Sequence, residues 1–344
     1  MAVTAKMVKE LREMTGAGMM DCKKALVETD GNIEAAVDLL KEKGLAKAAK
    51  KAGRVAAMGL VRTAIAADGK SAAIVEVNSE TDFVAKNDEF VTFVETLAQM
   101  ALENDAKDMD EFMALPYGDE GSVQDVLTNK IATIGENMTI RRFEKVSGEA
   151  VVSYIHGGRI GALIAGSVEA DDDVKAALTN VAMQVAAMNP QYIAKEDISA
   201  EELAKTKEIT IDSALNDPAS LPKPILNSLF AKAVEGNVFS AEDAAAYEEQ
   251  KNNKYLFNFL SEAAKKSLAE LALADKAAIV ENKIFNGLVE GRISKQLKEI
   301  TLLEQPYVKA EDGKQTVKAY LASVNKDLKL TKMVRFEVGE GMEK

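Results

Sequence analysis

Few residues of this chain could perform chemistry. Its single histidine, His156, is followed by two glycines and has no serine or cysteine nucleophile motif near it, which argues against a catalytic triad. One histidine and one cysteine, Cys22, leave no cluster for zinc, and a lone cysteine cannot form an intramolecular disulfide. We therefore expect no catalytic residue, no metal site and no cofactor, and interpret His156 as a contact residue or a residue without a role.

Two glycine-rich segments, residues 16–18 and 157–161, lack the Gly-Lys-Ser/Thr ending of a phosphate loop. Three consecutive aspartates at residues 171–173 are typical of a helix N-cap and first turn rather than of a calcium loop. These segments therefore predict neither a nucleotide site nor a calcium site.

An acidic and an aromatic residue, Asp82 and Phe83, stand side by side at the exit of a predicted strand. The segment follows an alternating run, residues 72–77, and precedes a run of apolar residues at helical spacing. An aromatic residue on a short connector can be inserted into another protein. Spacing alone favours the simpler interpretation, in which Phe83 begins the buried face of the next helix, because Phe90 lies seven residues further on.

The composition, 47% hydrophobic and 28% charged, fits a globular protein in water. No apolar run approaches the roughly 18 residues of a membrane span, and the N-terminus lacks the apolar core of a signal peptide. We therefore expect a cytoplasmic protein. The formal charge of −12 argues against nucleic-acid binding by the whole protein, because phosphate neutralisation needs excess Lys and Arg.

A basic stripe is the local exception to this acidic composition. It comprises Lys41, Lys43, Lys47, Lys50, Lys51 and Arg54, against Glu42 alone. An acidic partner surface, RNA, and a solvated helix face with a linker are three interpretations that the pattern leaves open.

Apolar spacing predicts three short N-terminal helices, at residues 4–14, 19–28 and 33–43, with Gly44 closing the third. They would form a small bundle tethered through residues 45–54. The predicted bundle core contains Val8, Leu11, Leu26, Ile33, Ala36, Val37 and Leu40. Met19 and Met20 are adjacent and cannot both point inward, so we expect at least one to be exposed.

The rest of the chain alternates between strand and helix periods. A hairpin followed by a helix occurs twice, which predicts two similar α+β halves. The predicted elements are strands 60–65, 72–77 and 138–146, helices 88–103 and 123–134, then strands 150–155 and 160–168 and helix 172–188. Residues 198–303 are almost wholly helical in pattern and predict an inserted helical hairpin, whose last helix would present one apolar face from Val280 through Ile284 to Ile300. Helix 317–324 and strand 332–338 follow, and the strand would complete the second half's sheet.

These residues also carry a family resemblance. Residues 7–26 resemble the N-terminal signature of elongation factor Ts, and residues 81–86 resemble that family's second signature. Three short motifs match in the same order, at residues 134–137, 156–157 and 335–341. The resemblance covers residues 1–205 and 285–344, and segment 206–284 is longer than the coiled-coil insertion expected in this family.

The resemblance implies an α+β fold with an N-terminal three-helix UBA-like bundle, a core of two similar halves with antiparallel sheets, and an inserted long helical hairpin or coiled coil. The predicted segments are 1–54 for the bundle and linker, 55–146 for the first half, 147–200 with 301–344 for the second half, and 201–300 for the insertion.

The same resemblance implies a guanine nucleotide exchange factor, without catalytic chemistry of its own, for the GTPase elongation factor Tu. Asp82 and Phe83, between Thr81 and Val84, would push between helices of the GTPase near its magnesium and phosphate site. Two further sets would contact the partner: Arg12, Met19, Met20 and Lys23 from the bundle, and Ile134, Gly135 and His156 from the second half and its approaches. No membrane and no direct nucleic-acid partner are expected, and assembly of two copies of each protein stays open.

Two functions of other classes compete with this one. The first is an RNA-associated protein that works through the basic stripe, which salt-sensitive RNA binding in an electrophoretic shift would support. The second is a small-molecule enzyme in a cleft between the two halves. It requires a cluster of perturbed acids and bases, and the sequence offers no convincing one.

Overall fold

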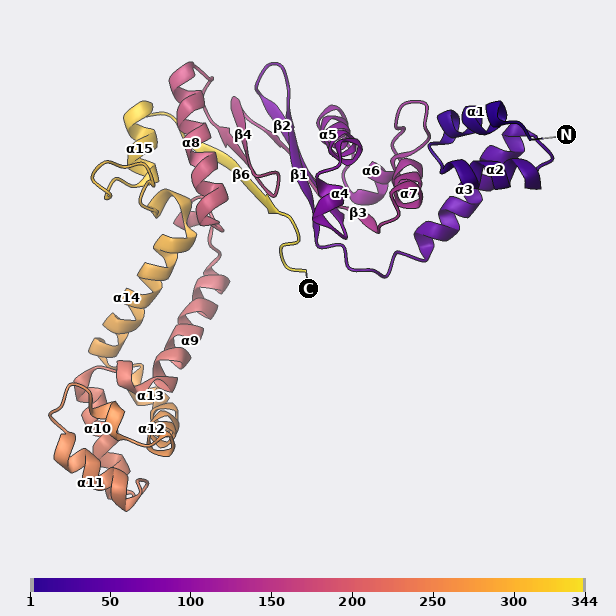
Figure 1. The fold of residues 1–344 in the computed structure, drawn as a ribbon. Helices are drawn as coiled ribbons and strands as arrows, with labels where there is room; N and C mark the ends of the chain where they lie inside the picture. Colours follow the sequence, from indigo (N-terminus) through magenta and orange to yellow (C-terminus); the bar gives the residue numbers. More distant parts are fainter. Residues whose placement is uncertain (1–2, 343–344) are drawn as a thin grey trace. The chain divides into compact units, whose positions relative to one another are not determined.

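The computed structural model describes residues 3–342 and divides into two units (Figure 1). The first unit comprises Met1–Asn189 and Tyr307–Lys344, and the second comprises Pro190–Pro306. Helices and two antiparallel sheets share the chain, so the predicted α+β class is confirmed. Within residues 3–342, no helix is long and apolar enough to cross a membrane.

The N-terminal bundle consists of α1 (Ala5–Thr15), α2 (Met19–Glu28) and α3 (Ile33–Ala49). The Thr4 side chain caps α1, and Gly16 ends it in the left-handed conformation at φ 63°. The predicted core is confirmed, with Val8, Leu11, Leu26 and Ala36 buried and Ile33, Val37 and Leu40 packed against them.

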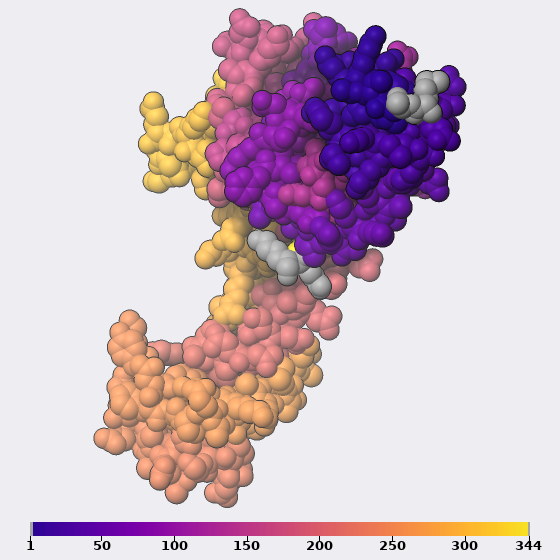
Figure 2. Space-filling model, turned by 45° about the vertical axis from the view of Figure 1, so that its right-hand side comes forward, coloured from indigo at the N-terminus to yellow at the C-terminus, as the bar shows by residue number. Residues whose placement is uncertain are grey.

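The predicted end of the third helix at Gly44 is wrong, because α3 continues to Ala49. Gly44 is buried, and a Cβ built there would lie 3.6 Å from Cβ of Ala132 on α7 (Val123–Ile134). Gly44 therefore lies inside the helix, where α3 contacts α7, and does not mark the end of a helix. The bundle meets the following half where α3 packs on α7, and Figure 2 shows its indigo residues on the face that is turned forward.

The first sheet has the order β1-β2-β3, with strands Met58–Ile65, Ser71–Ser79 and Met138–Ser147. Helix α5 (Asp88–Glu103) packs on β1 and β2 and buries Phe90 and Phe93. The helices α4 (Asp82–Ala85) and α6 (Met109–Met113) were not predicted, because each is too short to show a helical period.

The second sheet has the order β4-β5-β6, with strands Ala150–His156, Ile160–Gly166 and Leu330–Glu337. Helix α8 (Asp172–Met188) covers β4 and β5, and α15 (Val317–Val324) packs on α8. The predicted completion of this sheet by the late strand is confirmed, since β6 pairs with β5.

The two sheets approach each other closely. Gly161 faces the first sheet, and a Cβ built on it would lie 2.5 Å from Cγ1 of Val61 and 2.9 Å from Cδ1 of Ile74. The backbone N–H of Val61 donates to the Gly158 carbonyl at 2.8 Å, which links β1 to the β4–β5 turn. This packing brings the β4–β5 turn beside the first half.

The second unit contains α9 (Ala200–Asn216), α10 (Lys223–Glu235), α11 (Ala241–Gln250), α12 (Glu262–Ala274), α13 (Lys276–Ile279), α14 (Lys283–Ile300) and the 3-10 turns Lys195–Asp197, Pro218–Ser220, Leu256–Phe259 and Leu302–Glu304. Helices α9 and α14 run side by side (Figure 1). The unit has its own core, in which the Phe230 and Tyr247 rings stack with centroids 4.3 Å apart. The insertion is thus more than a hairpin.

The predicted apolar face of the last insertion helix needs correction. Ile284 is 55% exposed, whereas Phe285 and Val289 are buried, and α14 begins only at Lys283, after Val280. Phe285 occupies the core and turns its neighbour Ile284 to solvent.

Candidate partner-binding site

Phe83 is 81% exposed, the highest exposure among the large apolar side chains of the described chain. It lies on α4, a helix of four residues whose next two side chains, Val84 and Ala85, are buried in the first half's core. The simpler interpretation, in which Phe83 begins the buried face of α5, is therefore wrong. Val84 and Ala85 attach the helix while Phe83 projects into solvent.

Asp82 precedes Phe83 and is also exposed. The Lys86 ammonium lies 2.8 Å from its Oδ2, and this hydrogen-bonded ion pair lowers the pKa of Asp82 below 3.8. The positive charge of Arg159, in the β4–β5 turn, lowers the pKa of Asp82 further. Arg159 was missed by sequence reasoning, because only the packing of the two sheets brings this turn toward α4.

The base of α4 is held by Glu136. Its carboxylate accepts from the Thr81 backbone N–H at 3.0 Å and from the Thr81 hydroxyl at 2.7 Å. Gly135, the residue before Glu136, ends α7 at φ 91°, and Ile134 is half-buried against the first half's core. The structure thus brings Thr81 beside the Ile134–Asn137 motif. Glu136 belongs to that motif, but its partner could not be read from the sequence.

The predicted contact residues of the bundle flank the turn between α1 and α2. Arg12 lies in the last turn of α1, and Met19, Met20 and Lys23 lie on α2, all exposed. Both methionines face solvent, at 58% and 63% exposure, and Met14 at 62% adds a third that sequence reasoning missed. Methionine is a compliant contact residue, so the three supply an adaptable apolar surface.

His156 ends β4 and is exposed. Its Nδ1 lies 3.2 Å from the Tyr154 hydroxyl. The Arg159 N–H donates to the His156 carbonyl at 3.0 Å, so the turn that carries Arg159 toward Asp82 begins at His156.

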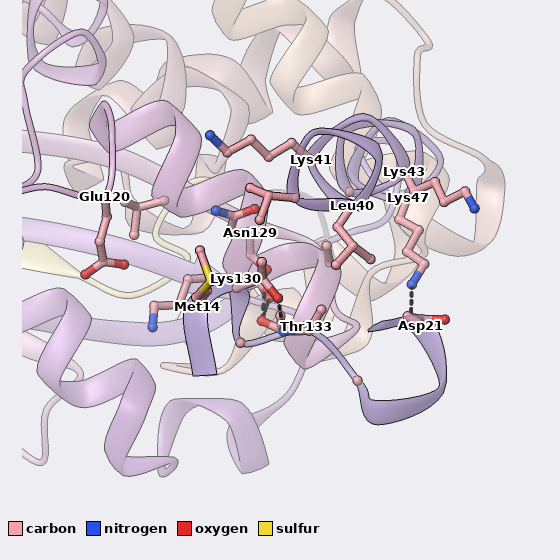
Figure 3. Close-up of a pocket in the computed structure, with 18 of the residues that line it drawn as sticks. Met14, Asp21, Leu40, Lys41, Lys43, Lys47, Glu120, Asn129, Lys130 and Thr133 are labelled. Atoms are coloured by element: carbon pink, nitrogen blue, oxygen red, sulfur yellow. Dashed lines mark hydrogen bonds and ion pairs between the residues drawn. The ribbon is translucent and has the colours of Figure 1, made fainter. Parts of the chain in front are cut away.

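A groove of about 770 Å³ lies between the bundle and α7 (Figure 3). Met14, Leu40 and Thr133 line it together with charged side chains of both signs, and Lys47 pairs with Asp21 at its rim. No histidine or cysteine is among its lining residues, and none of the predicted contact residues lines it. Within residues 3–342, no group of three or more His, Cys, Asp or Glu side chains is placed to hold a metal ion.

Three of the six basic side chains of the stripe form ion pairs within the chain. Lys43 pairs with Glu28 at 2.6 Å, Lys47 with Asp21 at 2.8 Å and Arg54 with Glu80 at 3.5 Å. The Lys51 ammonium lies 3.5 Å from the Ile131 carbonyl oxygen. These ion pairs offset part of the positive charge of the stripe, which weakens the basis for the RNA hypothesis.

The chain is similar in sequence to known proteins. The family model described as Elongation factor TS matches residues 80–340, and the one described as UBA/TS-N domain matches residues 3–40. Elongation factor Ts of Clostridioides difficile (strain 630) is 44% identical over 347 residues, which cover 99% of this chain and 94% of that protein. Elongation factor Ts of Clostridium botulinum (strain Eklund 17B / Type B) is 41% identical over 350 residues, and that of Clostridium tetani (strain Massachusetts / E88) is 42% identical over 352 residues. Each of these two alignments covers 99% of this chain and 95% of the relative. Because the family model covers most of the chain and the relatives cover nearly all of it, the chain belongs to the elongation factor Ts family.

Proposed function

We propose that this chain is a guanine nucleotide exchange factor for elongation factor Tu in translation elongation. We also propose that α4, which carries Asp82 and Phe83, is the element that inserts into the GTPase. Family membership supports the exchange-factor role. The observation that supports the mechanism is the 81% exposure of Phe83 on a short, anchored helix. An exposed aromatic residue carries a large apolar surface that becomes buried only when a partner covers it.

An exchange factor needs no catalytic group of its own. It accelerates GDP release by binding the nucleotide-free GTPase more tightly than the GDP form, and linkage requires GDP to weaken the exchange factor's binding by the same factor. Each tenfold of coupling corresponds to about 1.4 kcal/mol of differential binding. In this proposal, Phe83 supplies the coupling by displacing side chains that support the partner's magnesium site, with Asp82 at its side.

The remaining predicted contacts serve association. Met19 and Met20 offer apolar surface, and Arg12 and Lys23 offer charge, on the exposed side of the bundle. Gly135 and His156 lie at the ends of α7 and β4 in the two halves of the core. Ile134 and Val84 are largely packed inside the protein, so we assign them the task of supporting the contact surface from beneath.

The experiment is the release rate of a fluorescent GDP analogue from elongation factor Tu of the same cell, measured against exchange-factor concentration. The parent should accelerate release, and Phe83→Ala should lower the saturating rate about tenfold or more. Phe259→Ala is the matched control, because Phe259 is a half-exposed phenylalanine of the second unit, at 49% exposure.

Stability measurements distinguish two roles for Phe83: a wedge, meaning an exposed side chain that inserts into the partner, and a core residue. Phe83 buries only about a fifth of its surface, so its truncation should cost no more than about 1 kcal/mol at about 25 cal/mol per Å². A core phenylalanine would cost about 3 to 5 kcal/mol. Failure of the parent to accelerate GDP release would refute the proposed function, and unchanged exchange by a folded Phe83→Ala variant would refute the wedge.

A further inference from the structure

The turn between α7 and β3 holds two segments of the chain at once. We propose that Glu136 and Asn137 in this turn are positioning residues. Glu136 fixes the orientation of the Phe83 helix, and Asn137 fixes the segment that arrives from the N-terminal bundle. We call the contacts of Glu136 and Asn137 with these two segments the clasp. The consequence of the clasp for GDP release rests on the proposed function, whereas the contacts themselves are a property of this chain alone.

The Glu136 side of the clasp sets the first turn of α4. Both carboxylate oxygens are used, one by the Thr81 N–H at 3.0 Å and the other by the Thr81 hydroxyl at 2.7 Å. The Thr81 hydroxyl oxygen in turn accepts from the Val84 N–H at 3.5 Å as the cap of α4. A helix of four residues is far below the length that is stable by itself. Its orientation must therefore come from this cap and from the buried Val84 and Ala85.

The Asn137 side ties in the chain that leaves α3. Asn137 is only 6% exposed, and its carboxamide donates to the Arg54 carbonyl at 2.7 Å and to the Ala52 carbonyl at 3.5 Å. Its backbone N–H donates to the Glu80 carboxylate at 2.6 Å, and the Arg54 guanidinium lies 3.5 Å from the same oxygen. One turn thus connects residues 52–54, after the bundle, with residues 80–81, before Phe83.

The two carboxamide bonds of Asn137 reach backbone carbonyls and are neutral, whereas the contacts with the Glu136 and Glu80 carboxylates are charge-assisted. Such bonds are shorter and about twice as strong as neutral ones, and they fix main-chain positions. Phe83 itself makes little contact with the protein, so nothing in its own side chain resists rotation of α4. Together with the packing of α3 on α7, these contacts keep Phe83 and the three exposed methionines of the bundle in a fixed relation before a partner arrives, which lowers the ordering cost of binding.

The first test is a double-mutant cycle in the GDP-release assay. Glu136→Ala should lower the saturating release rate about tenfold. In the Phe83→Ala background the same change should cause almost no further loss of rate, because both changes act through the Phe83 side chain. Glu111→Ala is the matched control, since Glu111 also accepts a backbone N–H, that of Lys107 at 2.9 Å, within the same half. Losses that simply add in the double variant would overturn the positioning role.

The second test needs no GTPase. Amide hydrogen exchange at Thr81 and Val84 should be about tenfold faster in Glu136→Ala than in the parent, while the β2 amides keep their protection. Unchanged protection at Thr81 and Val84 would overturn the clasp, even if the parent proves to be an exchange factor. Conversely, faster exchange at these amides with no acceleration of GDP release by the parent would refute the proposed function and leave the clasp standing.

Glu136→Gln keeps the side-chain length and one acceptor oxygen, and covers the case in which the alanine variant does not fold. It should give a smaller change of the same sign in both assays. A glutamine variant that matches the parent in both assays would also overturn the proposal.

Discussion

The Glu76 carboxylate is completely buried in β2 and accepts hydrogen bonds from four groups. Its donors are Arg142 Nε at 2.6 Å, the Gly339 backbone N–H at 2.8 Å, Arg141 Nη1 at 3.0 Å and Asn78 Nδ2 at 3.2 Å. Arg141 also donates to the Glu340 carbonyl, so the network fastens the residues after β6 to the first sheet. We expect this carboxylate to be a major determinant of the stability of the first unit.

Glu76→Gln keeps the shape of the side chain and removes its charge. Breaking a buried charged pair from one side costs about 3 to 5 kcal/mol, because the partner charges lose their compensation. The two arginine side chains retain 25% and 31% exposure, so water partly compensates them and the lower end of that range applies. At roughly 2 to 4 °C per kcal/mol for a domain of this size, the melting temperature should fall by about 6 to 12 °C.

The assay is thermal unfolding followed by circular dichroism, with amide hydrogen exchange at Gly339 as a local readout. Glu95→Gln is the control, because Glu95 pairs with Arg62 at 3.3 Å but is 59% exposed, and such a pair contributes about 0 to 1 kcal/mol. A melting temperature within about 2 °C of the parent, with Gly339 still protected, would refute this account of the network.

Two further predictions concern the sheet interface and the bundle. Gly161→Ala should destabilise the first unit by about 1 to 3 kcal/mol in denaturant unfolding, because its Cβ would lie 2.5 Å from Val61, and a neutral result would refute the close approach of the sheets. The Lys47 ammonium donates to Asp21 and holds the pKa of that carboxyl below 3.8, so the pair contributes stability that is present above pH 3.8 and lost as the pH falls through the lowered value. Lys47→Met should return the pKa of Asp21 toward 3.8 in a carboxyl NMR titration, and an unchanged titration would contradict the pairing.

Much of the fold follows from local patterns. Helix α5 begins at Asp88 and α8 at Asp172, as predicted, because Asn87 and Asp171 cap them at the start of their apolar periods. Gly44 illustrates the limit of such patterns. A glycine after an apolar run is the usual mark of a helix end, but here the helix continues through it and contacts α7, and a contact between distant segments is not visible in any local pattern.

The candidate site was less accessible to sequence reasoning than the fold. Spacing placed Phe83 in the core, and the structure exposes it, because Val84 and Ala85 occupy the inward positions of a helix too short to be recognised. The family resemblance supplied the alternative that spacing did not favour. Glu136 and Arg159 were missed for a common reason, since each acts on α4 across a gap in sequence that no local pattern spans.

The place of β6 in the chain has a consequence for biosynthesis. Strand β5 pairs with β6, but the whole second unit, Pro190–Pro306, is translated between them. At about 5 to 20 residues per second, the β4–β5 hairpin waits on the order of ten seconds with one edge unpaired. An unpaired edge is a template for wrong association during that interval. The insertion has its own core and can fold while the hairpin waits, and the sheet of the second half can be completed only after the insertion has been synthesised.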